Sequence, residues 1–314
     1  MELSMKFKLF DMNRDGLGVE KGEDATPNVA YFFKSLWRKF PKLISINLLM
    51  ILQHLPLLGA VLTYFWVDKT PTFTDVSYPL LYGISRFSDA PADKLIAALS
   101  SVQLRIPLLS LRVLIQIALF LLLYALLFGI CNVAFSYYMR EMLRGNPVFL
   151  FSDFKYAVKK NFKQGFLMGL IDIVILGVLV FDFANMPSNS LMYFLILGVA
   201  IIYFIMRFYF YLMLITFDMK ITKMFKNAFI FVILGVKRNL LAILWLIVMM
   251  ALNFAIFVLY MPLGIALPIL YFFSFSTFTT AYAAYPVIEK YMIDPYKAKQ
   301  EVEETENAEN LPEV

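Results

Sequence analysis

Six long runs of apolar residues constrain this chain more than any other feature of its sequence. A helix needs about 20 predominantly apolar residues to cross the hydrocarbon core of a bilayer. The runs are too long and too uniformly apolar to be the amphipathic core helices of a soluble protein. The sequence therefore predicts an all-α, polytopic integral membrane helix bundle with six transmembrane helices. The expected spans cover residues 43–66, 108–135, 166–183, 191–217, 240–260 and 263–285.

Composition argues against a soluble protein. Hydrophobic residues make up 61% of the 314 residues and charged residues only 16%, whereas a soluble domain is roughly half apolar and a quarter charged. Lipid is the solvent that accommodates the excess apolar surface. The chain has one cysteine, Cys131, and one histidine, His54. These counts exclude cysteine-pair metal sites and most chemistry that joins a nucleophile to a histidine.

Lysine and arginine are unevenly distributed among the segments between the spans. They are dense before the first span, between spans two and three, between spans four and five, and after the last span. The segments 182–190 and 261–262 contain none, and the four in the 67–106 loop are offset by four aspartates. Because cytoplasmic loops are enriched in positive charge, we expect a multi-pass protein of the cell membrane with both termini in the cytoplasm.

Three of the basic segments also carry aromatic and aliphatic residues at helical spacing, each followed by a basic pair and a span. This pattern predicts amphipathic interfacial helices on the cytoplasmic side, where basic side chains touch anionic inner-leaflet lipid or a partner. The recurrence favours a threefold repeat of one helix and one transmembrane hairpin; alternatively, multispan proteins in general place basic aromatic helices at their inner face. The candidate lipid- or partner-contacting residues are Lys34, Arg38, Lys155, Lys159, Lys163, Lys220 and Lys223.

The chain is expected to have three parts. Residues 1–30 form a turn-rich cytoplasmic segment, residues 31–290 the six-span membrane domain, and residues 291–314 an acidic tail whose composition predicts disorder. Within the 67–106 loop, an apolar stripe over residues 95–102 predicts a short helix.

Two charged residues lie inside predicted spans: Asp172 in the third and Arg207 at comparable depth in the fourth. Charged groups inside a bilayer are costly, so they are candidates for a functional polar site. The structural alternatives are a buried ion pair between hairpin partners, or an Arg207 side chain that extends to lipid phosphates.

Gln53 and His54 add polar groups near the middle of the first span, directly before Leu55 and Pro56. Pro56 lacks a backbone N–H and is a candidate helix kink, which would leave carbonyl groups free to line a cavity. Gln53 and His54 are therefore candidates, with Asp172 and Arg207, for an intramembrane polar site. The structural alternative is that they hydrogen-bond neighbouring helices.

Motifs of enzyme chemistry are missing from the sequence: there is no His-Glu-x-x-His, no Gly-x-Ser-x-Gly and no phosphate-binding glycine loop before a lysine. Residues 11–22 begin like a calcium loop, but the twelfth position is Gly22 rather than the glutamate that calcium requires. We therefore expect a non-enzymatic protein with no catalytic residue, cofactor, metal ion or nucleic-acid partner.

Several motifs in the first half of the chain resemble those of the YesL-like family. They are residues 14–21, 32–40, 47–49 and 55–56, and later the segments 144–147 and 153–164. The family comprises integral membrane proteins of Gram-positive bacteria without an established activity. The resemblance implies six spans and an association with carbohydrate uptake systems, but no catalytic residue and no substrate.

These observations lead to two functional hypotheses. The first is a non-enzymatic accessory or regulatory membrane protein, associated with carbohydrate uptake or sensing, that contacts a solute uptake permease or a sensor kinase. The alternative is a small-solute transporter that uses the polar residues of its helix bundle. Internal repeats are common in transporters, although three hairpins differ from the usual inverted halves.

Overall fold

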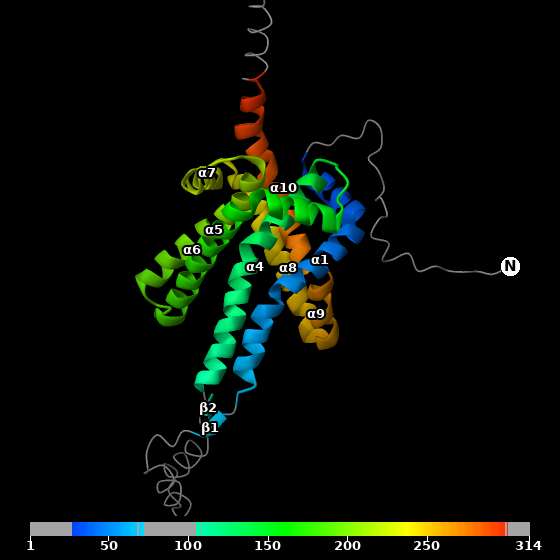
Figure 1. The fold of residues 1–314 in the computed structure, drawn as a ribbon. Helices are drawn as coiled ribbons and strands as arrows, with labels where there is room; N and C mark the ends of the chain where they lie inside the picture. Colours follow the sequence, from blue (N-terminus) through cyan, green and yellow to red (C-terminus); the bar gives the residue numbers. More distant parts are fainter. Residues whose placement is uncertain (1–26, 68, 72–104, 108, 299, 301–314) are drawn as a thin grey trace, which may run out of the picture. The chain divides into compact units, whose positions relative to one another are not determined.

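The computed structural model describes residues 27–67, 69–71, 105–107, 109–298 and 300 (Figure 1). The prediction of an all-α polytopic membrane protein is confirmed, because six helices in the described residues are long and apolar enough to cross a membrane. Five of them are α1 (Val29–Phe65), α4 (Leu111–Leu143), α5 (Leu150–Asn185), α6 (Leu191–Thr216) and α8 (Val236–Leu259). The sixth joins α9 (Met261–Leu267), the π-helix η2 (Pro268–Phe272), α10 (Phe273–Ile288) and the π-helix η3 (Glu289–Ile293).

The chain divides into two compact units. The larger comprises Met1–Gln53 and Ala125–Val314, and the smaller comprises His54–Tyr124. Within the smaller unit, strands β1 (Lys69–Pro71) and β2 (Arg105–Pro107) pair antiparallel with Thr70 opposite Ile106. The predicted helix at residues 95–102, the segment 1–26 and the tail beyond residue 300 lie outside the described residues. The last helix continues past the expected domain boundary at residue 290, as far as Ala298.

The three basic segments form helices before spans, in the order that the repeat predicts, but each joins its span differently. In α1 the helix is continuous, and the Asn28 side chain caps its start by accepting the Tyr31 N–H at 2.8 Å. In α5 the junction is a kink at Asn161, whose backbone is non-helical and whose side chain donates to the Ala157 carbonyl at 3.0 Å. The third segment is a separate helix, α7 (Ile221–Leu234), which ends at Gly235.

The second half of α6 lies in the core of the larger unit, and the helix packs against α5, α7 and α10. All residues from Phe208 to Ile215 are buried, and Tyr209 and Phe210 are among the largest side chains with no exposed surface. The outer faces of the spans carry many exposed leucine, isoleucine, valine and phenylalanine side chains. Such surfaces are stable in lipid, so both the inner and the outer faces of these helices are apolar.

Glycines allow α4 and α5 to cross closely. A Cβ atom at Gly129 would lie 2.1 Å from the Gly165 carbonyl oxygen, and one at Gly169 would lie 2.3 Å from the Gly129 Cα atom. Gly165 and Gly169 are four residues apart, which is the small-xxx-small spacing that lets transmembrane helices approach. This crossing fixes the position of Asp172, one turn further along α5.

A polar side chain compensates for the irregular backbone of the sixth span. The π-helix at Pro268–Phe272 disturbs the regular hydrogen-bond ladder. Asn47 of α1 is fully buried and donates to the carbonyls of Pro268 and Ile269, at 3.3 and 2.6 Å, while it accepts the Ser274 N–H at 2.9 Å. In apolar surroundings such groups need an internal partner, so Asn47 stabilises the irregular segment.

Candidate functional site

The first polar cluster surrounds Asp172 inside the hairpin of α5 and α6. Its carboxylate has no exposed surface and forms an ion pair with Arg207, whose Nε atom lies 3.0 Å from Oδ1. The Tyr203 hydroxyl donates to Oδ1 at 2.8 Å, and the Tyr211 hydroxyl donates to Oδ2 at 3.4 Å. One guanidinium and two phenols therefore satisfy the carboxylate, as a charge buried in apolar surroundings requires.

Asp172 and Arg207 were predicted as site residues from the sequence, whereas Tyr203 and Tyr211 were not. Residues 203, 207 and 211 recur every four positions, so their side chains lie on one face of α6. That spacing was visible in the sequence. It was not informative there, because tyrosines occur throughout the chain and the sequence does not show which face of α6 meets α5.

Gln53 of α1 is connected to the Asp172 cluster by Phe128 of α4, which contacts both Gln53 and Arg207. Its Nε2 atom donates to the Phe128 carbonyl at 3.4 Å, and the Arg207 guanidinium lies 5.9 Å from the centre of the Phe128 ring. The Asn132 side chain lies beside the Tyr211 hydroxyl. Two buried polar atoms here, Gln53 Oε1 and Asn132 Nδ2, have no hydrogen-bond partner among the described residues.

His54 and Pro56 belong to the smaller unit. The His54 ring lies 5.8 Å from the ring of Tyr124, centre to centre, and the described donors to Asp172 come from α6 instead. Helix α1 continues through Pro56 to Phe65, so the proline does not end the helix, and a bend there stays a prediction. A cavity of about 430 Å³ in this unit is lined by Leu62, Thr63, Trp66, Val67, Ser110, Val113 and Gln116, none of which is a predicted site residue.

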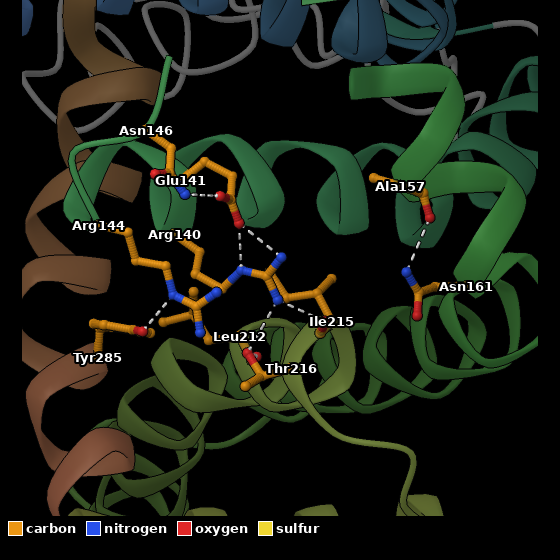
Figure 2. A network of polar contacts seen from close by, with 10 residues as sticks. All are labelled: Arg140, Glu141, Arg144, Asn146, Ala157, Asn161, Leu212, Ile215, Thr216 and Tyr285. Carbon is orange, nitrogen blue, oxygen red and sulfur yellow. Dashed lines mark hydrogen bonds and ion pairs between the residues drawn. The ribbon is translucent and has the colours of Figure 1, made fainter. Parts of the chain in front are cut away.

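The second polar cluster, the Glu141 network, lies where α4 ends (Figure 2). Arg140 and Glu141 are both buried, and Glu141 Oε1 accepts from the Arg140 guanidinium at 2.8 and 2.9 Å. Arg140 also donates to the Ile215 carbonyl at 2.7 Å, at the end of α6. The other carboxylate oxygen of Glu141 accepts from Asn146 at 2.6 Å. The network therefore joins the ends of α4 and α6 to the loop that follows α4.

Two further cations tie the end of α4 to neighbouring helices. Arg144 donates through Nε to the Tyr285 hydroxyl of α10 at 2.7 Å. Lys39 of α1 donates to the Met142 carbonyl, one of the last carbonyls of α4. Carbonyl groups at a helix C-terminus lack intrahelical donors and carry partial negative charge, so cations are stabilising there.

The loop between α4 and α5, residues 144–149, begins with a regular helix stop. Gly145 has a φ of +81°, the Gly145 N–H bonds to the Met142 carbonyl at 3.2 Å, and the Asn146 N–H bonds to the Glu141 carbonyl at 2.9 Å. These are the two hydrogen bonds of a Schellman motif. The side-chain bond from Asn146 to Glu141 joins the same two positions that a hydrophobic contact commonly joins in this motif.

The other end of the loop is equally well held. The Phe149 N–H donates to the Asp153 carboxylate at 2.7 Å, and the Tyr138 hydroxyl donates to the Leu150 carbonyl. Val148 and Leu150 are buried. Phe149 and Phe151, which alternate with these two buried residues, point toward the surface instead. Their exposed fractions are 55% and 72%.

The predicted basic residues of the three segments are mostly exposed. Arg38 is half-buried, whereas Lys34, Lys155, Lys159, Lys163, Lys220 and Lys223 are exposed. Lys155 and Lys159 follow the exposed phenylalanines on α5, beside Tyr156, which is 52% exposed. In the described part of the chain, no group of three His, Cys, Asp or Glu residues could hold a metal ion.

Comparison with known protein families gives a match to part of the chain. Residues 108–183 match a family described as "Protein of unknown function, DUF624". This stretch contains α4, the loop 144–149 and Asp172 on α5. It also contains Arg140, Glu141 and Asn146 of the Glu141 network. No curated protein and no solved structure matches the chain.

Proposed function

We propose that this protein is a non-enzymatic accessory or regulatory protein of the cell membrane, of the YesL-like type, that binds a solute uptake permease or a sensor kinase. Carbohydrate is the solute class that this type implies. Both termini lie in the cytoplasm, and the loop 144–149 with the first turns of α5 is the docking surface. We call this surface, with Phe149, Phe151, Lys155, Tyr156 and Lys159, the loop platform.

One observation carries the proposal: a loop held at both ends presents exposed aromatic side chains. The Schellman motif and the Asp153 bond fix the backbone on either side of Phe149. Two large apolar side chains near the exposed Lys155 and Lys159 are then left without cover from the described residues. Fixed aromatic anchors lose little conformational entropy on binding, and aromatic residues dominate the binding energy of protein interfaces.

The chemistry of the loop platform indicates the chemistry of its partner. Phe149 and Phe151 fit an apolar pocket, and Lys155 and Lys159 beside them fit an acidic rim. A fluid lipid surface does not need side chains in fixed positions, whereas a protein pocket does. The fixed loop therefore favours a protein over lipid as the occupant of this surface.

Site-specific photo-crosslinking in native membranes tests the proposal. A benzophenone amino acid at Phe151 is expected to form an adduct with a solute permease or sensor kinase, identified by mass spectrometry. The matched control is the same probe at Phe181, which lies on the same helix and is similarly exposed, at 67%. There we expect lipid adducts. Lipid adducts alone at both positions would contradict the proposal.

A small-solute transporter is the second candidate, and the Asp172 cluster is the observation that favours it. A buried carboxylate, a partly exposed Arg207 and the Gln53 Oε1 atom, which has no hydrogen-bond partner among the described residues, lie among α1, α4, α5 and α6. Uptake into proteoliposomes that Asp172→Asn abolishes, with the folded fraction unchanged, would support transport. His54→Ala provides a second test of the same hypothesis.

A further inference from the structure

Helix α7 has one face that packs on the protein and fixes its orientation. Met224, Ala228 and Phe231 are buried on this face. The Phe231 ring lies 5.4 Å from that of Tyr209 on α6. In Figure 1, α7 lies across one end of the helices of the larger unit rather than along them. Its remaining surface therefore faces away from the other helices of the larger unit.

The junction with α8 keeps α7 in this place. Gly235 separates the two helices, and a Cβ atom there would lie 2.5 Å from the Tyr209 hydroxyl oxygen. Asn239 is buried, accepts from the Tyr209 hydroxyl at 2.7 Å and donates to the Phe231 carbonyl at 3.3 Å. Asn239 therefore holds the end of α7 against α6, with Phe231 on the inner side of the helix.

The outward face of α7 changes in character along the helix axis. The first half presents lysines, since Lys220, Lys223 and Lys226 are all exposed. The second half presents apolar side chains, with exposed fractions from 39% to 63%: Phe229, Ile230, Ile233 and Leu234. The helix contains no aspartate or glutamate. The nearest preceding acid, Asp218, accepts a hydrogen bond from Gln164 at 3.4 Å.

We propose that this face of α7 is a binding site for an anionic phospholipid of the adjoining leaflet. The lysines bind the phosphate headgroup, and the apolar half of the helix contacts the acyl chains. Three cations, two on α7 and one at its N-cap, complement a phosphodiester, and the helix carries no acid. The adjoining apolar residues select a lipid over a soluble phosphate, because burial of the acyl chains adds to the affinity.

The side chains of α7 differ from those of the loop platform in a way that suits lipid. Lysine is a compact cation on a flexible stem, so it follows a mobile headgroup without a fixed geometry. The apolar residues here are mainly aliphatic. The lipid site is therefore separate from the protein-docking surface, and the two can be tested independently.

Native mass spectrometry of the delipidated, full-length protein tests the site. The probes are phosphatidylglycerol and phosphatidylcholine of identical acyl chains, each titrated in detergent. The variant is Lys223→Gln with Lys226→Gln, and the matched control is Lys290→Gln with Lys297→Gln, which removes the same charge from exposed positions in the last helix.

We expect the unmodified protein to bind phosphatidylglycerol more tightly than phosphatidylcholine. The α7 double variant should lose about 30-fold in phosphatidylglycerol affinity, since each lysine near an anionic surface contributes ~1 kcal/mol. The control variant should lose less than about threefold. Phe229→Ser with Ile233→Ser keeps the lysines, and we expect it to weaken phosphatidylglycerol binding as well.

Three outcomes would overturn the lipid site. The first is equal affinity for the two lipids, and the second is an equal loss in the α7 variant and its control. The third is competition by glycerophosphoglycerol, the headgroup without acyl chains, as strong as that by the intact lipid. That result would make the lysines a site for soluble phosphodiesters. Crosslinking at Phe151 is unaffected by any of these results, so the proposed function stands or fails separately.

Discussion

The Asp172 cluster and the Glu141 network each bury one carboxylate beside one arginine, but they satisfy the charges with different groups. Asp172 lies in the middle of a span, where the backbone is already hydrogen-bonded within its helix. Its remaining donors are therefore side chains of α6, the two tyrosine hydroxyls. Glu141 lies at a helix end, and its Arg140 partner also donates to a terminal backbone carbonyl of α6.

The difference shows that position along a span determines which groups can neutralise a buried charge. In the middle of a helix, an ionised group depends on side chains that the neighbouring helix supplies. At a helix end, the unpaired carbonyls are themselves partners, so one cation can serve a carboxylate and the backbone together. The Asp172 cluster accordingly joins two helices, whereas the Glu141 network joins the ends of several elements.

The largest effect is expected from Asp172→Leu, which leaves the Arg207 guanidinium without its carboxylate. We expect a loss of about 3–5 kcal/mol in the free energy of unfolding, measured by denaturant titration of the detergent-solubilised protein. The double variant Asp172→Leu with Arg207→Leu removes both charges and should recover most of the loss. A double variant as unstable as the single one would show that packing, not charge, dominates this site.

Glu141→Leu is expected to cost less, about 2–3 kcal/mol, because Arg140 keeps its bond to the Ile215 carbonyl. The informative readout is hydrogen exchange. Amides of the loop 144–149 should exchange faster in this variant than in the unmodified protein. In Asp172→Leu their exchange rates should stay unchanged. Equal protection of the loop in both variants would contradict the role of Glu141 in fixing the loop.

Replacement of the two tyrosines distinguishes the donors within the Asp172 cluster. Tyr203→Phe should cost about 1.5 kcal/mol, because its 2.8 Å bond to a charged acceptor is lost. Tyr211→Phe should cost less, since its bond to Asp172 is 3.4 Å long. Thermal unfolding of the two variants side by side measures this order, and the reverse order would contradict the described geometry.

The smallest effect is expected at the helix stop of the loop 144–149. Gly145→Ala forces a side chain into a backbone of positive φ and should cost about 1 kcal/mol. Gly177→Ala is the matched control, because Gly177 lies within a helix and a Cβ atom there would meet nothing within 4 Å. Thermal unfolding should show no loss for the control. Equal losses would mean that the conformation of Gly145 is not the cause.

Some features of the candidate site were accessible from the sequence. Asp172 and Arg207 stood out because charges inside apolar runs are rare, and consecutive spans place them at similar depth. The structure brings the two into contact. Glu141 did not stand out, because it lies in a segment already rich in charge. Asn47 was also unremarkable by type, and its role depends on an irregularity in a helix more than 200 positions away.

The sequence by itself determined the number of spans, because the length of an apolar run is a local property. The helices that carry the spans extend beyond the predicted limits, as in α5, which begins at Leu150 rather than at residue 166. The tertiary structure alone decided which faces of the helices meet, and hence the partners of Asp172 and the outward face of α7. In lipid the inner and outer faces of a span are both apolar, so hydropathy does not specify the rotation of a helix about its axis.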